Sequence, residues 1–181
     1  MRAFIAVEIS SSEILNKIQT FQNELKINAK PIRIDQIHFT LQFLGDISEE
    51  KCEQVKNVLE KIEFSQFELS LQRVGAFPNI RNPRVVWIGC DETGAEKLSS
   101  ITKEIEKNLT PLGFEKDKKF RPHLTVFRVK NKIGDISSKM NDFGETEFGV
   151  QVISKIKLKR SILSPKGPEY SDLLEVNGNE K

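Results

Sequence analysis

The stretches Ile37-His38-Phe39-Thr40-Leu41 and Pro122-His123-Leu124-Thr125-Val126 share a pattern found nowhere else in the chain. Each places a histidine two residues before a threonine, within an alternation of polar and apolar residues that is typical of a β-strand. The chain has no other histidine. Side chains two apart on a strand share a face, so each stretch offers an imidazole beside a hydroxyl. We expect the two pairs to face each other across a cleft and to hold a phosphate.

Length and composition predict a soluble globular protein with a single domain over residues 1–181, made of two interleaved lobes. Of its 181 residues, 38% are hydrophobic and 30% charged, and no apolar run approaches the ~20 residues of a membrane span. The net charge of +2 is too small for a general nucleic-acid binder, so any basic surface should be local. Cys52 and Cys90 lie far apart in different expected elements, which favours no disulfide framework and makes a reducing cytoplasm the default.

The rest of the sequence predicts a mixture of helices and strands. Ser10 and Ser48 are expected to cap the first two helices, Gly113 to end the third, and residues 75–83 to form a loop. The expected helices cover about residues 11–28, 49–62, 94–112 and 135–143. The expected strands cover about residues 1–8, 37–43, 67–71, 85–90, 123–128, 147–153, 156–163 and 173–176.

This order lacks the strict alternation of a doubly wound fold and predicts an α+β fold. Each histidine strand follows a helix, and each of those helices follows a strand, which suggests a weak internal repeat. The 85 residues between the histidines are close to half of the chain. We therefore expect a bilobal molecule with two mainly antiparallel sheets and outer helices, related by a pseudo-twofold axis, and an active-site cleft between the lobes.

Strict alternation divides the residues of the two motif strands between faces. The histidine face should carry His38, Thr40 and Gln42 on one strand and His123, Thr125 and Phe127 on the other. The opposite face should carry Ile37, Phe39, Leu41 and Phe43 on the first and Leu124, Val126 and Arg128 on the second. A later strand presents Lys155, Lys157 and Lys159 on one face, either as a track for an RNA backbone or as simply solvated lysines.

Two imidazoles around one phosphate are suited to acid–base chemistry. Because an unperturbed imidazole has a pKa of about 6.5, one of the two can accept a proton near neutral pH while the other donates one. Threonine hydroxyls can donate hydrogen bonds to the non-bridging oxygens as charge develops there. Such a site can displace at a phosphodiester without a metal, and the strained ring of a 2′,3′-cyclic phosphate makes it a natural substrate.

Two alternatives stand beside this interpretation. Each histidine could be purely structural, although its place on the polar face of a strand makes a core role awkward. A zinc site could be built from His38, His123, Cys52 and Cys90. Against zinc, Cys52 lies on the buried stripe of an expected helix, and the sequence contains no close-spaced pair of ligands.

Residues 38–45 and 121–128 resemble the paired signatures of the two-histidine (2H) phosphoesterases. The closer resemblance is to the 2′-5′ RNA ligase branch, the RNA 2′,3′-cyclic phosphodiesterases. Residues 2–7, 77–87 and 161–170 resemble the opening, central and closing segments of that branch, so the resemblance covers nearly the whole chain. Gln42 differs from the lysine that many relatives carry there, and Phe127 replaces a residue that is often small.

The resemblance implies a bilobal α+β enzyme that hydrolyses 2′,3′-cyclic phosphates to 2′-phosphates without metal, ATP or another cofactor, and reversibly joins RNA ends through 2′,5′ linkages. It implies His38, His123, Thr40 and Thr125 as catalytic residues. His123 would be the base toward water and His38 the acid toward the leaving 3′ oxygen, and the roles would swap in ligation. The implied partner is RNA with cyclic phosphate ends, tRNA fragments among the candidates, for a monomer in the cytoplasm that does not contact membranes.

Other functions stay open at this point. One is a phosphodiesterase that acts on 2′,5′-linked oligonucleotides or small cyclic nucleotides, and another is an RNA-end-binding protein without turnover. The residues expected to contact substrate are Arg121, Phe4, Phe77, Phe127 and Tyr170. Core packing is the competing role for Phe4 and Phe77, and an exposed salt bridge is the competing role for Arg121.

Overall fold

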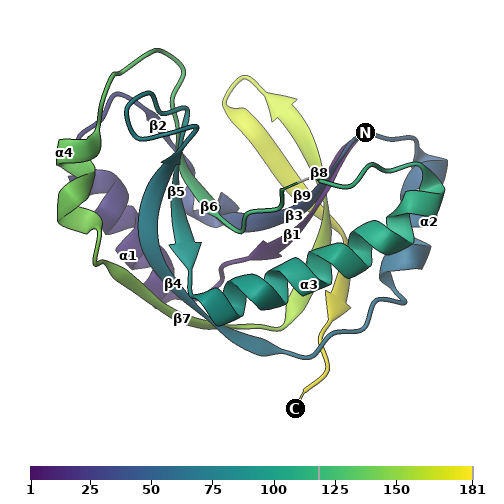
Figure 1. The fold of residues 1–181 in the computed structure, drawn as a ribbon. Coiled ribbons are helices and arrows are strands. Elements are labelled where there is room, and N and C mark those ends of the chain that lie inside the picture. The colour runs from purple at the N-terminus through teal and green to yellow at the C-terminus, as the bar shows by residue number, and fades with distance from the viewer. Residues whose placement is uncertain (118, 181) are drawn as a thin grey trace.

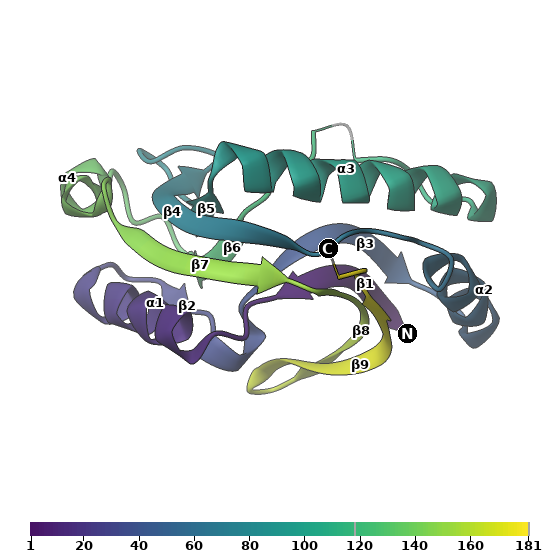
Figure 2. The same cartoon turned by 90° about the horizontal axis from the view of Figure 1, so that it is seen from below.

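A strongly curled antiparallel sheet forms the centre of the molecule, and helices lie against its outer side (Figures 1 and 2). This computed structural model describes residues 1–117 and 119–180. The strands of the sheet are β1 Arg2–Glu8, β2 Lys30–Pro31, β3 His38–Asp46, β4 Phe67–Phe77, β5 Val85–Cys90, β6 Leu124–Arg128, β7 Glu147–Ile153, β8 Lys155–Ser164 and β9 Gly167–Asn177. The helices are α1 Ser12–Glu24, α2 Glu49–Leu59, α3 Glu92–Leu109 and α4 Ser137–Met140, with short 3-10 turns at Ile34–Gln36, Thr110–Leu112 and Asn141–Phe143.

The sheet consists of two halves of four strands each. The strand order is β7-β4-β5-β6-β3-β1-β8-β9, and the short β2 pairs with β6 outside this path. The two motif strands, β3 and β6, therefore meet at the centre, where they pair through Phe39 and Leu124. The predicted α+β class with antiparallel strands is confirmed. The two expected sheets are continuous with each other because of this central pair.

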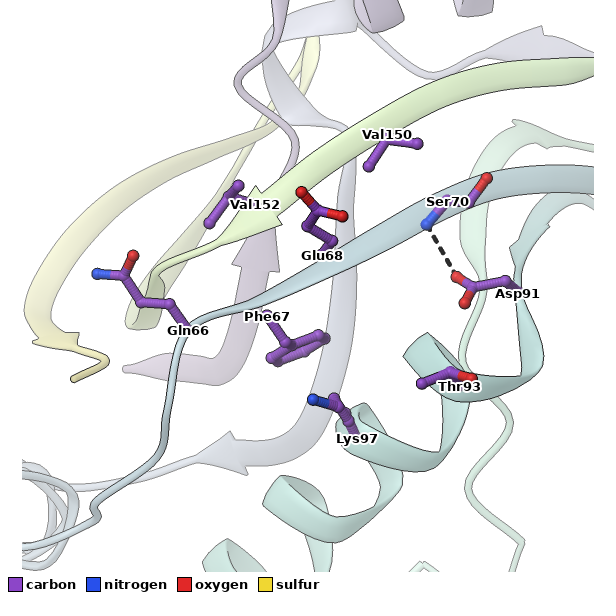
Figure 3. A pocket seen from close by; sticks show the side chains of 9 residues that line it. All are labelled: Gln66, Phe67, Glu68, Ser70, Asp91, Thr93, Lys97, Val150 and Val152. Carbon is purple, nitrogen blue, oxygen red and sulfur yellow. Dashed lines mark hydrogen bonds between the residues drawn. The ribbon is translucent and has the colours of Figure 1, made fainter. Parts of the chain in front are cut away.

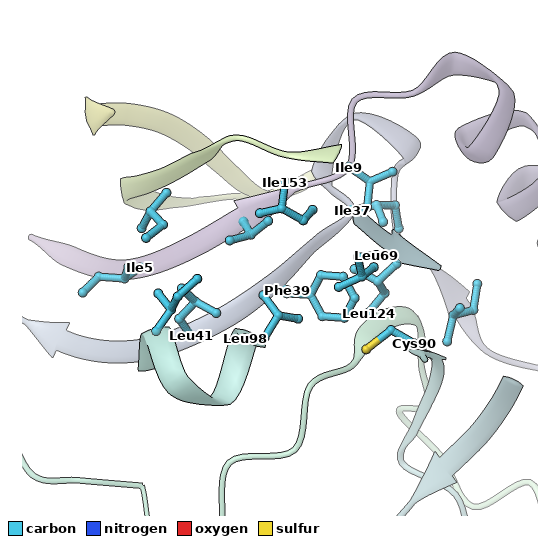
Figure 4. Packing of buried hydrophobic residues seen from close by; sticks show 14 of the residues in the cluster. Ile5, Ile9, Ile37, Phe39, Leu41, Leu69, Cys90, Leu98, Leu124 and Ile153 are labelled. Carbon is cyan, nitrogen blue, oxygen red and sulfur yellow. The ribbon is translucent and has the colours of Figure 1, made fainter. Parts of the chain in front are cut away.

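The core lies between the outer face of the sheet and the helices. Phe39, Leu41 and Leu124 of the motif strands are buried there, together with Leu98 of α3 (Figure 4). On β1, Ala3, Ile5 and Val7 belong to the same core, whereas Phe4 and Ala6 between them are buried outside it. Because the apolar residues of the motif strands are committed to this side, their histidines must lie on the inner, concave face. None of the described helices is long and apolar enough to cross a membrane.

The ends of the helices follow the capping chemistry with one shift. Ser48 caps α2 as predicted, since its hydroxyl accepts from the Lys51 N–H at 3.1 Å. The first helix is capped by Ser11, not by Ser10, and ends at Glu24, four residues before the predicted end. The N–H groups of Ser10 and Ser11 both donate to the side-chain oxygen of Gln151 on β7, at 2.9 and 3.1 Å, and this contact anchors the chain just before the helix.

Two strands, β4 and β9, extend furthest beyond the ranges that the sequence predicts. β4 continues to Phe77, so the first part of the predicted loop at 75–83 belongs to the sheet. Gly75 is needed in this extension because a Cβ there would lie 2.2 Å from the ring of Trp87. β9 begins at Gly167, directly after the turn from β8, and the two strands form the long hairpin on one side of the concave face (Figure 1).

Candidate active site

The pairing of β3 with β6 brings both histidine motifs onto one face. Phe39 and Leu124 lie opposite each other and point into the core, so the residues on either side of them point the other way. In an antiparallel pair this register sets His38 beside Thr125 and Thr40 beside His123. The four predicted catalytic residues thus form one cluster on the concave face, with each imidazole next to the threonine of the other strand.

A β-bulge on each motif strand decides what lies beyond this cluster. On β3, Thr40 pairs with Ala6 and Gln42 with Ile5, so Leu41 is an extra residue. On β6, Thr125 pairs with Trp87 and Phe127 with Val86, so Val126 is an extra residue. A bulge reverses the alternation of every residue that follows it. The two strands therefore carry the same irregularity at the same place after the threonine.

The predicted substrate contact at Phe127 is wrong for this reason. Phe127 is 3% exposed, and its ring packs on the core side against Phe21 of α1, with 6.4 Å between the ring centroids. Gln42, at the corresponding place on β3, is also buried, and its side-chain amide donates to the Glu115 carbonyl oxygen at 3.3 Å. The difference between glutamine and lysine at position 42 therefore does not change the charge of the concave face.

The same bulges turn Arg128 and Phe43 outward, against the alternation. Arg128 is exposed and directly follows Phe127, which points into the core, so it lies on the histidine side, where its charge acts on both His38 and Tyr170. Phe43, expected in the core, is 73% exposed and has its ring 6.4 Å from that of Phe4 on the concave face. Arg128 matches the family pattern, but alternation predicts a structural role for it unless a bulge turns it, and the exposure of Phe43 was not predicted, because a bulge leaves no mark on the apolar pattern.

Each histidine is held by a backbone carbonyl two residues before it. His38 Nδ1 lies 2.7 Å from the Gln36 oxygen, and His123 Nδ1 lies 2.7 Å from the Arg121 oxygen. A carbonyl oxygen only accepts, so in both rings Nδ1 carries the hydrogen and Nε2 is the free nitrogen. His38 Nε2 lies 3.0 Å from the Thr40 hydroxyl, which can donate to it. Both rings thus offer Nε2 for proton transfer.

The surroundings of His38 lower its pKa below the ordinary value of 6.5. Burial is the largest cause, and the positive charges of Lys159 and Arg128 act in the same direction. The hydrogen bond to the Gln36 carbonyl and the carboxylate of Glu8 oppose the shift without cancelling it. Near neutral pH the free protein therefore holds His38 as a neutral imidazole.

A cluster of ion pairs borders the histidine face on β1, β8 and β9. Glu8, opposite His38 on β1, pairs with Lys159 and, at 2.7 Å, with Lys157. Asp172 pairs with the same two lysines at 2.6 and 2.7 Å. Lys159 is only 6% exposed and Lys157 is held by carboxylates, so these two lysines form neither a free RNA track nor a solvated face, whereas Lys155 is exposed and pairs with Glu175 at 2.9 Å.

Aromatic rings lie against each histidine. Phe4 and Tyr170 surround His38, with centroid distances of 5.0 and 5.6 Å, and Phe77 meets the edge of His123 at 5.0 Å. Phe4 is 4% exposed, yet it belongs to the concave face and not to the main core. Three of the predicted substrate residues are therefore brought to the histidines. Of the other two, Phe127 is buried in the core, and Arg121 is exposed with a side chain that makes no ion pair within the described residues.

The four candidate zinc ligands are not brought together. Cys52 is buried on the inner side of α2, and Cys90 is buried in β5. Within residues 1–117 and 119–180, no group of three or more histidine, cysteine, aspartate or glutamate side chains is placed to hold a metal ion. The donors of the zinc alternative therefore belong to separate parts of the fold.

A hollow of about 590 Å³ lies elsewhere, beside β4, β7 and the start of α3 (Figure 3). Asp91 at its wall is the N-terminal cap of α3 and accepts from the backbone N–H groups of Ser70 and Gly94 at 2.8 and 3.1 Å. Neither histidine lines this hollow. Its Asp91 carboxylate is thus committed to the fold, and the candidate active site is the open concave face.

Comparison with known proteins agrees with this geometry. A family model described as LigT like Phosphoesterase matches the chain twice, over residues 7–87 and 88–170, so each match contains one histidine motif. The chain belongs to the LigT-like phosphoesterase family. The double match also agrees with the predicted internal repeat.

Curated relatives of this family member span its whole length. An RNA 2′,3′-cyclic phosphodiesterase of Archaeoglobus fulgidus is 39% identical over 175 residues, which cover 96% of this chain and 98% of the relative. A protein of the same name from Aquifex aeolicus is 34% identical over 178 residues, covering 94% of each chain.

Solved structures share the fold. The TT0787 protein of Thermus thermophilus superposes with a TM-score of 0.80 at 28% identity, covering 98% of this chain and 97% of the other. E. coli LigT complexed with 3′-AMP superposes with a TM-score of 0.77 at 22% identity, covering 97% of each chain. The LigT-like chain described here therefore has the curled-sheet fold of these proteins.

Proposed function

We propose that this protein is an RNA 2′,3′-cyclic phosphodiesterase that opens cyclic phosphate ends to 2′-phosphates by acid–base catalysis at His38 and His123. The observation that carries the proposal is the cluster of two imidazoles and two threonines at the β3–β6 pair. The matching Nδ1 contacts to backbone carbonyls support it, because they leave Nε2 of each ring free to exchange a proton. The names of the full-length relatives support the RNA substrate.

In the proposed reaction, one imidazole takes a proton from water as the water oxygen attacks phosphorus. The bond from phosphorus to the 3′ oxygen breaks on the opposite side, and the other imidazole, protonated, gives its proton to that oxygen. The product is a 2′-phosphate with a free 3′ hydroxyl. Thr125 donates a hydrogen bond to a non-bridging oxygen, and Thr40 does so once protonation of His38 Nε2 releases its hydroxyl hydrogen. The positive charge of Arg128 offsets the charge that develops on these oxygens.

The family resemblance assigns the base to His123 and the acid to His38, and we adopt this assignment. The lowered pKa of His38 limits when it can act as the acid, because the free protein holds the ring neutral near neutral pH. An acid must be protonated, so the bound phosphate anion must raise the pKa of His38 before the 3′ oxygen leaves. A lowered pKa also makes the protonated ring a stronger acid, which suits an alkoxide leaving group.

The remaining expectations stay proposals. We propose that residues 1–181 act as one domain and one monomer, in the cytoplasm, without metal or another cofactor, and that the reaction runs backward to join RNA ends through 2′,5′ linkages. Phe4, Phe77, Tyr170 and Arg121 are our candidates for contacts to the terminal nucleotide. RNA with cyclic phosphate ends is the proposed partner, with tRNA fragments as one source.

The test is to incubate the purified protein with a short RNA that ends in a 2′,3′-cyclic phosphate and to identify the product. We expect a 2′-phosphate, at a rate that EDTA leaves unchanged. A 3′-phosphate would contradict the proposed direction of ring opening, and loss of activity in EDTA with recovery in zinc would contradict the mechanism. Tight binding of the RNA without product would indicate an end-binding protein, and cleavage only of 2′,5′-linked oligonucleotides would indicate the other phosphodiesterase.

A further inference from the structure

Phe43 is an exposed aromatic residue that does not belong to the hydrophobic core. It is 73% exposed, although it follows Leu41 and Gln42 in a strand whose apolar residues are otherwise buried. Its exposure comes from the bulge at Leu41, which turns it to the concave face. A single exposed apolar side chain is ordinary on a protein surface, so the interest of Phe43 depends on what lies beside it.

The position of Phe43 continues the candidate active site in one direction. Phe4 lies between His38 and Phe43, with its ring 5.0 Å from the first and 6.4 Å from the second. Phe4 is almost fully covered by these neighbours and by Tyr170, so it has little free surface to offer a ligand. Phe43 therefore offers the open aromatic surface one ring beyond His38.

A cation lies at the same end of the face. Arg2 is two residues before Phe4 on β1, so it points to the concave side, and it lies between Asp46 of β3 and Ser161 of β8. It is exposed and forms no ion pair within the part of the chain that the structure describes. An exposed aromatic ring next to an unengaged cation is the combination by which proteins bind single-stranded nucleic acids.

The two halves of the sheet differ at this point. The bulge on β6 presents Arg128 near the histidines, whereas the matching bulge on β3 presents Phe43 farther along the face. One half thus offers a charge to the reacting phosphate, and the other offers a ring for a base. This difference gives the face a direction along which an RNA strand can lie.

We propose that Phe43 and Arg2 bind the nucleotide that precedes the cyclic phosphate end, with its base stacked on Phe43 and a backbone phosphate facing Arg2. The proposal rests on the proposed function and deepens it. The substrate is an RNA end of two or more nucleotides in preference to a mononucleotide. Stacking on one side chain tolerates any base, so the preference concerns length and not sequence.

The experiment compares two substrates, adenosine 2′,3′-cyclic phosphate and the dinucleotide ApA with a 2′,3′-cyclic phosphate end. The measured quantity is the ratio of kcat/KM for the dinucleotide to kcat/KM for the mononucleotide. We expect the wild-type ratio to exceed one and to fall about 10-fold in Phe43→Ala, since stacking contributes about 1–3 kcal/mol per base. Phe43→Trp should keep the ratio, and Arg2→Met should lower it and weaken its dependence on salt.

Val150→Ala is the matched control, because Val150 is 58% exposed on β7, beside the hollow that neither histidine lines, and has no place in the proposal. An unchanged ratio in Phe43→Ala would overturn the proposal, as would an equal loss on both substrates. Absence of turnover on both substrates by the wild type would instead reject the proposed function. In that case titration with ApA 2′-phosphate tests Phe43 separately, and equal binding by wild type and Phe43→Ala would overturn the subsite.

Discussion

Phe39 of β3 lies opposite Leu124 of β6, and through this pair the two halves of the sheet become continuous. Both side chains are fully buried in the core. The neighbours of each on its strand include a histidine and a threonine, so the contact that joins the halves also assembles the candidate active site. The proposed catalysis would thus depend on the same two positions as the stability of the sheet.

Replacing Phe39 by alanine should therefore affect both properties. A buried Phe→Ala change lowers the free energy of unfolding by about 3–5 kcal/mol, and the cavity would lie directly beneath the two motifs. Phe148→Ala on β7 is the control, because Phe148 is equally buried but does not adjoin a motif. Urea unfolding should show similar losses for the two variants, while turnover under folding conditions should fall much more in Phe39→Ala. Equal turnover would separate the core contact from the site.

Arg128 should matter more than Arg121. The bulge at Val126 places the Arg128 charge near His38, whereas the Arg121 side chain is exposed and only its carbonyl holds His123. We expect Arg128→Met to lower kcat/KM for a 2′,3′-cyclic nucleotide about 100-fold, the size typical of a lost charge-stabilising donor. Arg121→Met should cost less than about 10-fold, since its backbone contact is kept. A larger loss in Arg121→Met than in Arg128→Met would contradict the placement of Arg128 by the bulge. It would favour the strict alternation predicted from the sequence, in which Arg128 points away from the histidines.

The pH profile of kcat/KM should be bell-shaped, with one limb belonging to His38. The charge of Lys159 contributes to the lowered pKa of His38, and the charge of Glu8 opposes it. Lys159→Met should therefore move the His38 limb to higher pH, and Glu8→Gln should move it to lower pH. Movement of the alkaline limb would identify His38 as the acid and movement of the acid limb as the base. If the pH profiles of both variants coincide with that of the wild type, the charges of Lys159 and Glu8 do not affect the pKa of the titrating histidine.

The ion pairs on β1, β8 and β9 should make the fold sensitive to acid. Burial raises the pKa of Glu8 and of Asp172, but hydrogen bonds from Lys157 and Lys159 outweigh it and leave both below their ordinary values of 4.5 and 3.8. A lowered pKa stabilises the fold above the ordinary value, and that stabilisation is lost as pH falls toward the lowered one. Urea unfolding between about pH 5 and 3 should show this loss, and Asp172→Asn should show a shallower slope. An unchanged slope would contradict the role of the cluster.

Much of the fold could be predicted from the sequence because local rules determine it. The strands at Val85–Cys90 and Glu147–Ile153 lie where alternation and turn residues predict them, and Ser48 caps its helix. The capping prediction at Ser10 is wrong, and the N–H groups of Ser10 and of the actual cap, Ser11, both donate to Gln151, more than a hundred residues away. That contact is tertiary, and the spacing of residues near the helix contains no sign of it.

The candidate site was predictable up to the threonines and not beyond them. His38 and Thr40 precede the bulge, so alternation places them correctly, whereas the faces of Gln42 and Phe43 are exchanged by the extra residue at Leu41. A bulge depends on the register with the partner strand, and one strand's own sequence does not specify that register. The burial of Lys159 was hidden for a similar reason, because its partner carboxylates come from β1 and β9.

The most direct test of the central claim is a double-mutant cycle on the two histidines, with turnover of adenosine 2′,3′-cyclic phosphate as the measurement. If His38 and His123 act on one phosphorus atom, His38→Ala and His123→Ala should each reduce kcat by at least about 100-fold, and the double variant should be little worse than either single variant. Near-wild-type turnover in either single variant, with the fold intact by circular dichroism, would contradict the account.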